Sequence, residues 1–225
     1  FFKQKTAYEI RLSLVGSEMC IRDRENSFII VERPSDKSSR EVSLEDGSIR
    51  ARLKRSDQNL ELKIQTSQGT IRLQSPKSSE EEVQLQTSMI GGNLVVAVES
   101  GQVEITPKGQ PPISVSSAQK AEIRTNAKPV VAAYDMLMET KSPKPGAQLR
   151  EGSFIFEAVP VAGAKKYRWL VASSREMTTI LVEHRTTEPN LKLQYLDPGE
   201  LYWRVEAVGE DGMIRSSRPQ QIYVQ

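Results

Sequence analysis

Apolar and polar residues alternate at every second position through most of this 225-residue chain. Such alternation is typical of half-buried β-strands, in which successive side chains point to opposite faces. No stretch of helical length carries apolar residues at intervals of three and four. The sequence therefore predicts an all-β protein. The first group of predicted strands covers residues 42–44, 49–54, 60–64, 70–73, 83–85, 94–98, 103–105, 113–115 and 121–123, with Gly, Pro, Asn and Asp in the turns between them.

A weak internal repeat lies within this first group. Residues 42–51 read "VSLEDGSIRA" and residues 96–105 read "VAVESGQVEI", with apolar, acidic and glycine positions in the same order. Because glycine adopts a positive φ without steric cost, we expect each copy to be a hairpin with Gly47 or Gly101 in its turn. Both strands of each hairpin would bury the same face.

Three stretches of this region resemble the FecR domain of bacterial envelope proteins. They are "EDGSIRARL" (45–53), "LELKIQTSQGTIRLQ" (60–74) and "LVVAVESGQVEITPKGQPPISVSSAQKAEI" (94–123). The sequence departs from the family where Ser67 replaces a usual proline and where "QSPKSSEEEVQLQ" (74–86) replaces the usual "GTxFxV" stretch. The resemblance implies a β-roll or sandwich over residues 25–125, a location outside the cytoplasm, and a role in sensing or signal transfer.

The second half of the chain predicts a separate β-sandwich. Residues 126–149 carry three prolines and little alternation, so we interpret them as a linker that leads into a first strand. Residues 150–225 contain "SFIFEAV", "KYRWLVA", "LKLQYL", "ELYWRVEAVGEDG" and "QQIYV", with aromatic residues on alternate positions. They resemble a bacterial fibronectin type III or immunoglobulin-like module. Parity places Leu201, not Tyr202, at the corner tyrosine of that family, so we expect its hydroxyl-to-backbone hydrogen bond to be missing.

The first 24 residues do not fit either module. "KQKTAYE" (3–9) and "LVGSEMCIRD" (14–23) resemble the translation of the two constant parts of a sequencing-library adapter, in the right order and frame. Charged residues interrupt every apolar run, so this segment is neither a secretory signal nor a membrane anchor. We therefore expect residues 1–24 to lie outside the folded domains as a disordered tail, and their deletion to leave thermal stability unchanged.

Setting this segment aside changes the charge and the cysteine content. Five of the 31 basic residues and three of the 29 acidic residues lie in it, so the rest of the chain is balanced at 26 of each. A balanced chain argues against binding to nucleic acid. The single cysteine, Cys20, also belongs to the segment, which leaves no thiol chemistry in the remaining chain.

Few residues offer catalytic or metal-binding chemistry. His184 is the single histidine and stands in a polar stretch, so we interpret it as a solvent-exposed side chain. Glu80, Glu81 and Glu82 are adjacent, so on a strand they would point to alternate faces and could not converge on one cation. No glycine-rich phosphate or dinucleotide loop is present. We therefore expect no enzyme activity, no cofactor and no metal.

Two surfaces are candidates for binding a partner. Arg50, Arg52 and Lys54, followed by Arg55, would align on the solvent face of one strand and suit an anionic glycan, a lipid head group or an acidic protein. Alternatively, long cationic side chains only protect an exposed strand there. The second candidate is Tyr202 with nearby Arg204, which we expect on the outer face of the second module.

These observations predict a non-enzymatic interaction or scaffold protein of the bacterial envelope, outside the cytoplasm, with a protein or cell-wall glycan as its partner. Two alternatives remain open. The chain could be the periplasmic portion of a FecR-type sigma-factor regulator, which transfers a signal. It could also be a glycan-binding accessory region of a secreted hydrolase.

Overall fold

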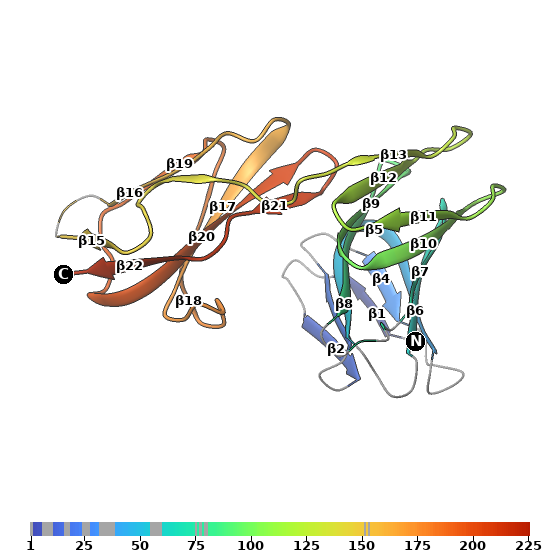
Figure 1. The fold of residues 1–225 in the computed structure, drawn as a ribbon, viewed down its shortest axis with the longest axis horizontal. Coiled ribbons are helices and arrows are strands. Elements are labelled where there is room, and N and C mark those ends of the chain that lie inside the picture. Colours follow the sequence, from blue (N-terminus) through green and yellow to red (C-terminus); the bar gives the residue numbers. More distant parts are fainter. Residues whose placement is uncertain are drawn as a thin grey trace. The chain divides into compact units, whose positions relative to one another are not determined.

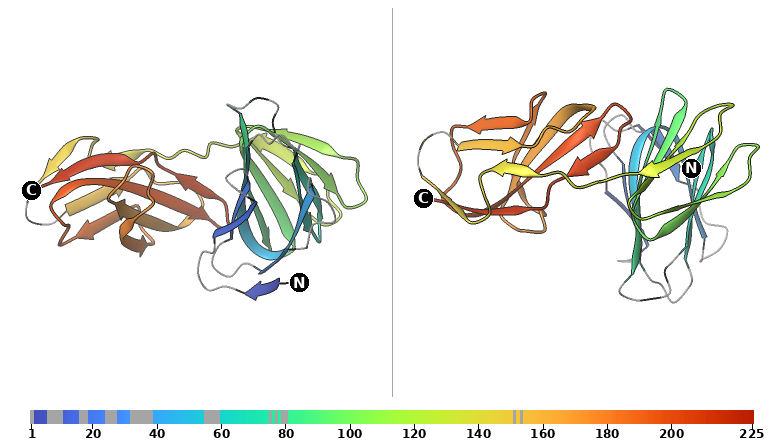
Figure 2. Two further views of the ribbon diagram at one scale, coloured as in Figure 1. Left: turned by 90° about the horizontal axis from the view of Figure 1, so that it is seen from below. Right: turned by 45° about the horizontal axis from the view of Figure 1, so that its top comes forward.

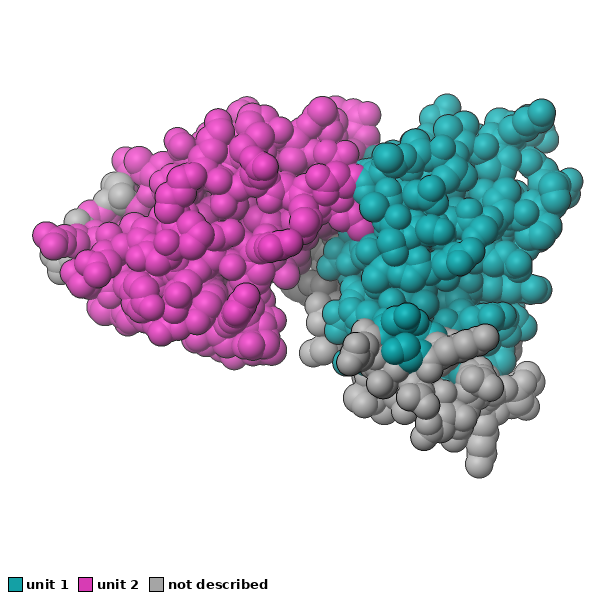
Figure 3. Space-filling model, in the orientation of Figure 1, with its two compact units in different colours: residues 1–134, 211–213 teal, residues 135–210, 214–225 magenta. Residues whose placement is uncertain are grey.

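The protein is described from a computed structural model, which covers residues 2–5, 11–15, 19–23, 28–31, 39–54, 60–74, 76, 78, 81–150, 152 and 154–225. Of the side chains before residue 39, it describes that of Ile21. The described residues form strands and turns throughout, which confirms the all-β prediction (Figure 1). The chain divides into two compact units, one of residues 1–134 with 211–213 and the other of residues 135–210 with 214–225 (Figure 3).

The first unit consists of two sheets that share one long strand. Sheet A has the order β1-β4-β5-β6-β7-β10-β11, and sheet B has the order β2-β3-β5-β8-β9-β12-β13. The strands are β1 (Phe2–Lys5), β2 (Arg11–Val15), β3 (Met19–Asp23), β4 (Phe28–Val31), β5 (Ser39–Lys54), β6 (Glu61–Thr66), β7 (Gly69–Gln74), β8 (Glu82–Ile90), β9 (Asn93–Ser100), β10 (Gln102–Pro107), β11 (Ile113–Ser116), β12 (Gln119–Ile123) and β13 (Val130–Ala133).

Strand β5 passes from one sheet to the other without a break. Its first half pairs with β4 and β6 in sheet A, and its second half, from Gly47 on, pairs with β3 and β8 in sheet B. Figure 1 shows the resulting curve of β5. The predicted hairpin at Asp46-Gly47 is therefore wrong. Gly47 does have a positive φ of 92°, but it bends one strand across the core instead of reversing the chain.

The second copy of the repeat makes the same crossing in the opposite direction. Strand β9 pairs with β8 and β12 in sheet B, whereas β10 pairs with β7 and β11 in sheet A. Gly101, with φ 77°, lies between β9 and β10. The predicted hairpin is wrong here too, because the two strands flanking the glycine do not pair. The repeat thus marks two glycines at which the chain changes sheet.

One hydrophobic cluster fills the space between sheets A and B. The apolar positions predicted from alternation are buried in it, apart from the partly buried Ile113, and they include Val42 and Leu44 before the β5 bend and Ile49, Ala51 and Leu53 after it. Both sheets contribute because the alternation shifts by one residue at the bend, so that even positions face inward before Gly47 and odd positions after it. The side chains at alternate positions of its second half point to the other side of sheet B.

The N-terminal segment is arranged differently from our expectation. Strand β3 pairs antiparallel with the second half of β5, and Ile21, opposite Ala51, is fully buried in the core. The physical reason lies in the acceptor strand: β5 presents backbone N–H and C=O groups along this edge, and an extended segment of any sequence can pair with them. An apolar residue at the inward position then completes the core.

The second unit is a two-sheet sandwich that begins inside the predicted linker (Figure 2). One sheet has the order β14-β16-β19, and the other has the order β15-β22-β20-β17-β18 with β21 beside β20. The strands are β14 (Thr140–Ser142), β15 (Ala147–Leu149), β16 (Phe154–Ala158), β17 (Ala164–Ala172), β18 (Ile180–Thr186), β19 (Asn190–Leu193), β20 (Gly199–Gly209), β21 (Ile214–Ser216) and β22 (Gln220–Val224). Strands β15 and β22 pair in parallel, and the other pairs are antiparallel.

Aromatic residues dominate the core of this sandwich. The ring of Phe156 meets that of Trp203 edge-on at 5.1 Å between centroids, and Trp169 stacks on Trp203 at 6.1 Å. Leu201 is buried and Tyr202 points outward, as parity predicted. The Tyr202 hydroxyl bonds the side chain of Glu200 instead of a backbone group. A different tyrosine binds the backbone: the amide of Val161 donates to the Tyr167 hydroxyl at 3.1 Å.

Gly101→Ala tests the role of the sheet crossing. A β-carbon there would lie 2.9 Å from Val83 Cγ2, at a φ that disfavours alanine, so we expect the unfolding free energy of the first unit to fall by about 2 kcal/mol. The control is Gly109→Ala, which has a similar φ of 70° but no atom within 4 Å, and should lose about 1 kcal/mol. Circular dichroism in urea reports on both units, whereas tryptophan fluorescence follows only the second, which contains Trp169 and Trp203. Equal losses for the two variants would contradict a steric role for Gly101.

Ile21→Ser tests whether the N-terminal segment belongs to the fold. Because Ile21 is fully buried against Ala51, we expect the variant to lose about 2–4 kcal/mol, and deletion of residues 1–24 to lower the melting temperature as well. Ile155→Ser is the matched control, since Ile155 is 53% exposed and should tolerate serine. Unchanged melting of both the deletion and Ile21→Ser would restore the expectation that this segment lies outside the fold.

Candidate functional site

The predicted basic row lies on the outer side of sheet B, where its charges have acidic partners. Arg50 Nη2 lies 2.8 Å from Glu99 Oε1 on β9, and Arg52 Nε lies 3.4 Å from Glu82 Oε2 on β8. Lys54 is exposed at the end of β5, directly opposite Glu82 in the β5–β8 register. Arg55 lies outside the described residues. Glu82 on β8 and Glu99 on β9 point to the same face as these cations. They offset most of the positive charge of the row.

A network of alternating charges covers the outer face of the six-stranded sheet in the second unit. We call it the Arg–Glu ladder, and its members in order are Arg185, Glu183, Arg168, Glu206 and Arg204. Arg168 holds Glu183 through two hydrogen bonds of 3.0 and 2.9 Å, and Arg185 adds a third at 3.1 Å. On the other side, Glu206 lies 3.5 Å from Arg168 and 2.9 Å from Arg204. The ladder therefore joins β18, β17 and β20.

The ladder owes its position to strand register. Leu170 on β17 lies opposite Glu183 on β18 and Arg204 on β20, and it is 2% exposed although it points away from the aromatic core. The stems of long charged side chains can cover such an apolar residue while their charged ends stay near water. Glu206 is itself 4% exposed, and a buried carboxylate is tolerated only when paired. The positions of these charged side chains are thus held by contacts within the sheet itself.

Beside the ladder lies a small group of tyrosines and their partners. Tyr202 donates a hydrogen bond to Glu200, which also accepts one from Gln221 Nε2 at 2.9 Å. The Tyr202 hydrogen bond lowers the pKa of Glu200 and raises that of the Tyr202 hydroxyl. Tyr223 pairs with Glu200 in the β20–β22 register and is 37% exposed. The structure therefore brings the two predicted residues, Tyr202 and Arg204, into one face with the ladder.

The ladder also shifts the titration of one of its members. The hydrogen bonds from Arg168 are the largest cause that lowers the pKa of Glu183, and Arg185 adds to the effect. Glu183 therefore stays ionised into acidic solution. Titration of Glu183 therefore does not change the charge of this face within the physiological pH range.

The residues considered for chemistry do not converge on a site in the described part of the chain. His184 is exposed on β18, opposite Trp169. Glu82 is engaged with Arg52, Glu81 is exposed in the preceding turn, and Glu80 lies outside the described residues. Among the described residues, no group of three or more His, Cys, Asp or Glu side chains is placed to hold a metal ion. No helix there is long and apolar enough to cross a membrane.

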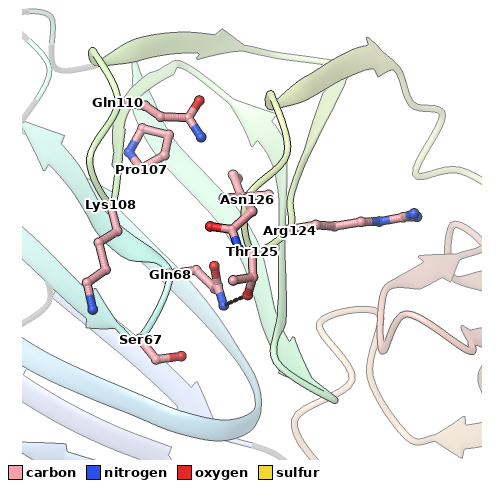
Figure 4. A pocket seen from close by; sticks show the side chains of 9 residues that line it. Ser67, Gln68, Pro107, Lys108, Gln110, Arg124, Thr125 and Asn126 are labelled. Carbon is pink, nitrogen blue, oxygen red and sulfur yellow. Dashed lines mark hydrogen bonds between the residues drawn. The ribbon is translucent and has the colours of Figure 1, made fainter.

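A pocket of about 430 Å³ opens at one end of the first unit (Figure 4). Three turns line it: the β6–β7 turn, the β10–β11 turn and the segment that follows β12. The lining residues are Ser67, Gln68, Pro107, Lys108, Gln110, Ile123, Arg124, Thr125 and Asn126. The predicted strands left two of these turns between them, at 65–69 and 106–112, but the sequence did not indicate the pocket. The alternation of apolar and polar residues predicts where each strand ends, but it does not predict which turns lie next to one another in the fold.

No protein-family model matches this chain, and no curated protein matches it either. A structure from Parabacteroides distasonis, described as that of an anti-sigma factor, is similar at a TM-score of 0.50 and 9% identity, over 67% of this chain and 78% of the other. A fibronectin(III)-like module of Clostridium thermocellum CbhA aligns with 39% of this chain and 94% of its own length, at 16% identity and a TM-score of 0.32.

The extracellular domain of a hybrid two-component system from B. thetaiotaomicron aligns with 96% of this chain and 36% of its own length, at 8% identity and a TM-score of 0.32. At these identities the first similarity shows a shared fold, and the two with lower TM-scores carry no further weight. The chain therefore has an all-β architecture of the kind found in the P. distasonis protein.

Proposed function

We propose that this chain acts by binding another protein, as a non-enzymatic interaction module of a bacterial envelope protein outside the cytoplasm. The observation that carries the proposal is the outer face of the six-stranded sheet, which holds the Arg–Glu ladder, Tyr202 next to it on β20, and Tyr223 opposite Glu200 on β22. Arginine and tyrosine are enriched at the centres of protein interfaces, because each combines a large contact area with hydrogen-bonding groups.

The ladder favours a protein partner because its side chains are already ordered. Binding normally costs about 0.5–1.5 kcal/mol for each long side chain that it immobilises. Here Arg168 is held by Glu183 and Glu206, and Arg204 by Glu206, so this cost has been met during folding. The alternating charges would also select a partner with a complementary pattern more than they would attract anions in general.

Within this role, signal transfer is the more specific proposal. The fold similarity to a protein described as an anti-sigma factor supports it, as does the resemblance of residues 45–123 to the FecR domain. The envelope location rests on the same resemblance. A scaffold protein would bind its partner through the same face, but binding would not have to change its conformation or activity.

Site-specific crosslinking tests the binding face. Benzoylphenylalanine placed at Tyr223, on the same face as the ladder, should crosslink to a defined protein in the envelope fraction of a bacterium that carries the gene. Tyr195 is the matched control, since it is a more exposed tyrosine, at 71%, in the turn that follows β19. Bands of equal intensity from the two positions, or no band from position 223, would argue against this face as the binding site.

A further inference from the structure

The pocket of the first unit is built on a closed set of hydrogen bonds between its three turns. The Lys108 amide donates to the Gln68 carbonyl at 2.9 Å, which joins the β10–β11 turn to the β6–β7 turn. Gln68 Nε2 donates to Thr125 Oγ1 at 2.8 Å, which joins the β6–β7 turn to the segment after β12. Gln110 Nε2 donates to the Ala127 carbonyl at 2.9 Å and closes the ring. The pocket is therefore preformed.

The segment after β12 has a conformation that suits this role. Asn126 adopts a φ of 58°, in a turn closed by the Ala127 amide and the Arg124 carbonyl at 3.2 Å. Asparagine is one of the few residues other than glycine that tolerates this conformation. In Figure 4 Asn126 and Thr125 lie close to Gln68, whereas the Arg124 side chain extends away from the other labelled side chains.

Three carboxamide side chains contribute to the polar lining of the pocket. Each of Gln68 and Gln110 uses one side-chain N–H to hold a neighbouring turn, which leaves a second N–H and a carbonyl oxygen. Asn126 adds a third carboxamide and Ser67 a hydroxyl. A carboxamide presents a donor and an acceptor side by side, which matches the adjacent hydroxyl groups of a sugar ring, since each hydroxyl can also donate and accept.

The rest of the lining adds one available cation. Pro107 and Ile123 also line the pocket, but both are buried and leave little apolar surface for a ligand. Lys108 is exposed at the rim, and among the described residues no hydrogen bond or ion pair engages its ammonium group. Arg124, by contrast, is paired with Glu122 at 3.2 Å. Lys108 therefore supplies the available charge of the pocket.

We propose that this pocket binds an acidic oligosaccharide, with Lys108 on the carboxylate of a uronic acid residue and the carboxamides of Gln68, Gln110 and Asn126 on its ring hydroxyls. This inference goes beyond the proposed protein-binding function and does not depend on it, because it concerns the first unit and a different ligand. It also moves the predicted glycan contact away from the row of Arg50, Arg52 and Lys54, whose two arginines are paired with acidic residues.

Titration of the ¹⁵N-labelled full chain with tetragalacturonic acid, followed by NMR, tests the proposal. We expect the side-chain NH₂ signals of Gln68, Gln110 and Asn126 to shift with one common dissociation constant. The fully methyl-esterified tetramer has the same rings and hydroxyls without the charge, and should bind about fivefold more weakly, as expected for the loss of about 1 kcal/mol from one partly exposed ion pair.

Two lysine variants separate this pocket from the basic row. Lys108→Gln should weaken binding of the acid about fivefold and make the acid and its ester bind alike, whereas Lys54→Gln should leave binding unchanged. Gln68→Ala should weaken binding of both forms. Thermal melting confirms that each variant is folded. The proposal is overturned if tetragalacturonate shifts none of the three carboxamide signals at millimolar concentration, if Lys108→Gln binds the acid as well as the parent does, or if Lys54→Gln is the variant that loses binding.

Discussion

The arrangement of the first unit depends on a single strand that belongs to two sheets. Because β5 pairs with β4 and β6 before Gly47 and with β3 and β8 after it, sheets A and B cannot move apart without breaking a continuous backbone. The chain passes between the same sheets again at Gly101, where β9 of sheet B is followed directly by β10 of sheet A. The turns that follow β6, β10 and β12 line one pocket of this unit.

Alternation of apolar and polar residues was sufficient to predict the strands but not their partners. The inward positions of β5, such as Val42, Ile49 and Leu53, were predicted from sequence and are buried. The role of Gly47 was not predicted. A glycine that bends one strand and a glycine that reverses the chain both appear in the sequence as a glycine between two alternating segments. Only the pairing partners distinguish the two cases, and these lie far away along the chain.

The candidate surfaces show the same limit. Parity placed Tyr202 and Arg204 on the outer face, which is where they lie, but it could not show that Glu206 and Arg168 would join Arg204 in one network. Likewise, three cations on alternate positions of β5 indicated a basic surface until β8 and β9 placed Glu82 and Glu99 beside them. The charges on one strand do not determine the charge of the sheet surface, because side chains of the neighbouring strands lie on the same face and can neutralise them.

The parallel pair of β15 and β22 gives the second unit a direction in which it resists force. These strands lie near its two ends in the chain, with Ala147 opposite Ile222 and Leu149 opposite Val224. In this arrangement a pull toward the N-terminus at β15 and toward the C-terminus at β22 slides the two strands past each other. Their hydrogen bonds then carry the load together, whereas strands peeled apart from one end lose them one at a time. Force applied along the chain at these two points would therefore load the backbone hydrogen bonds of this pair in shear.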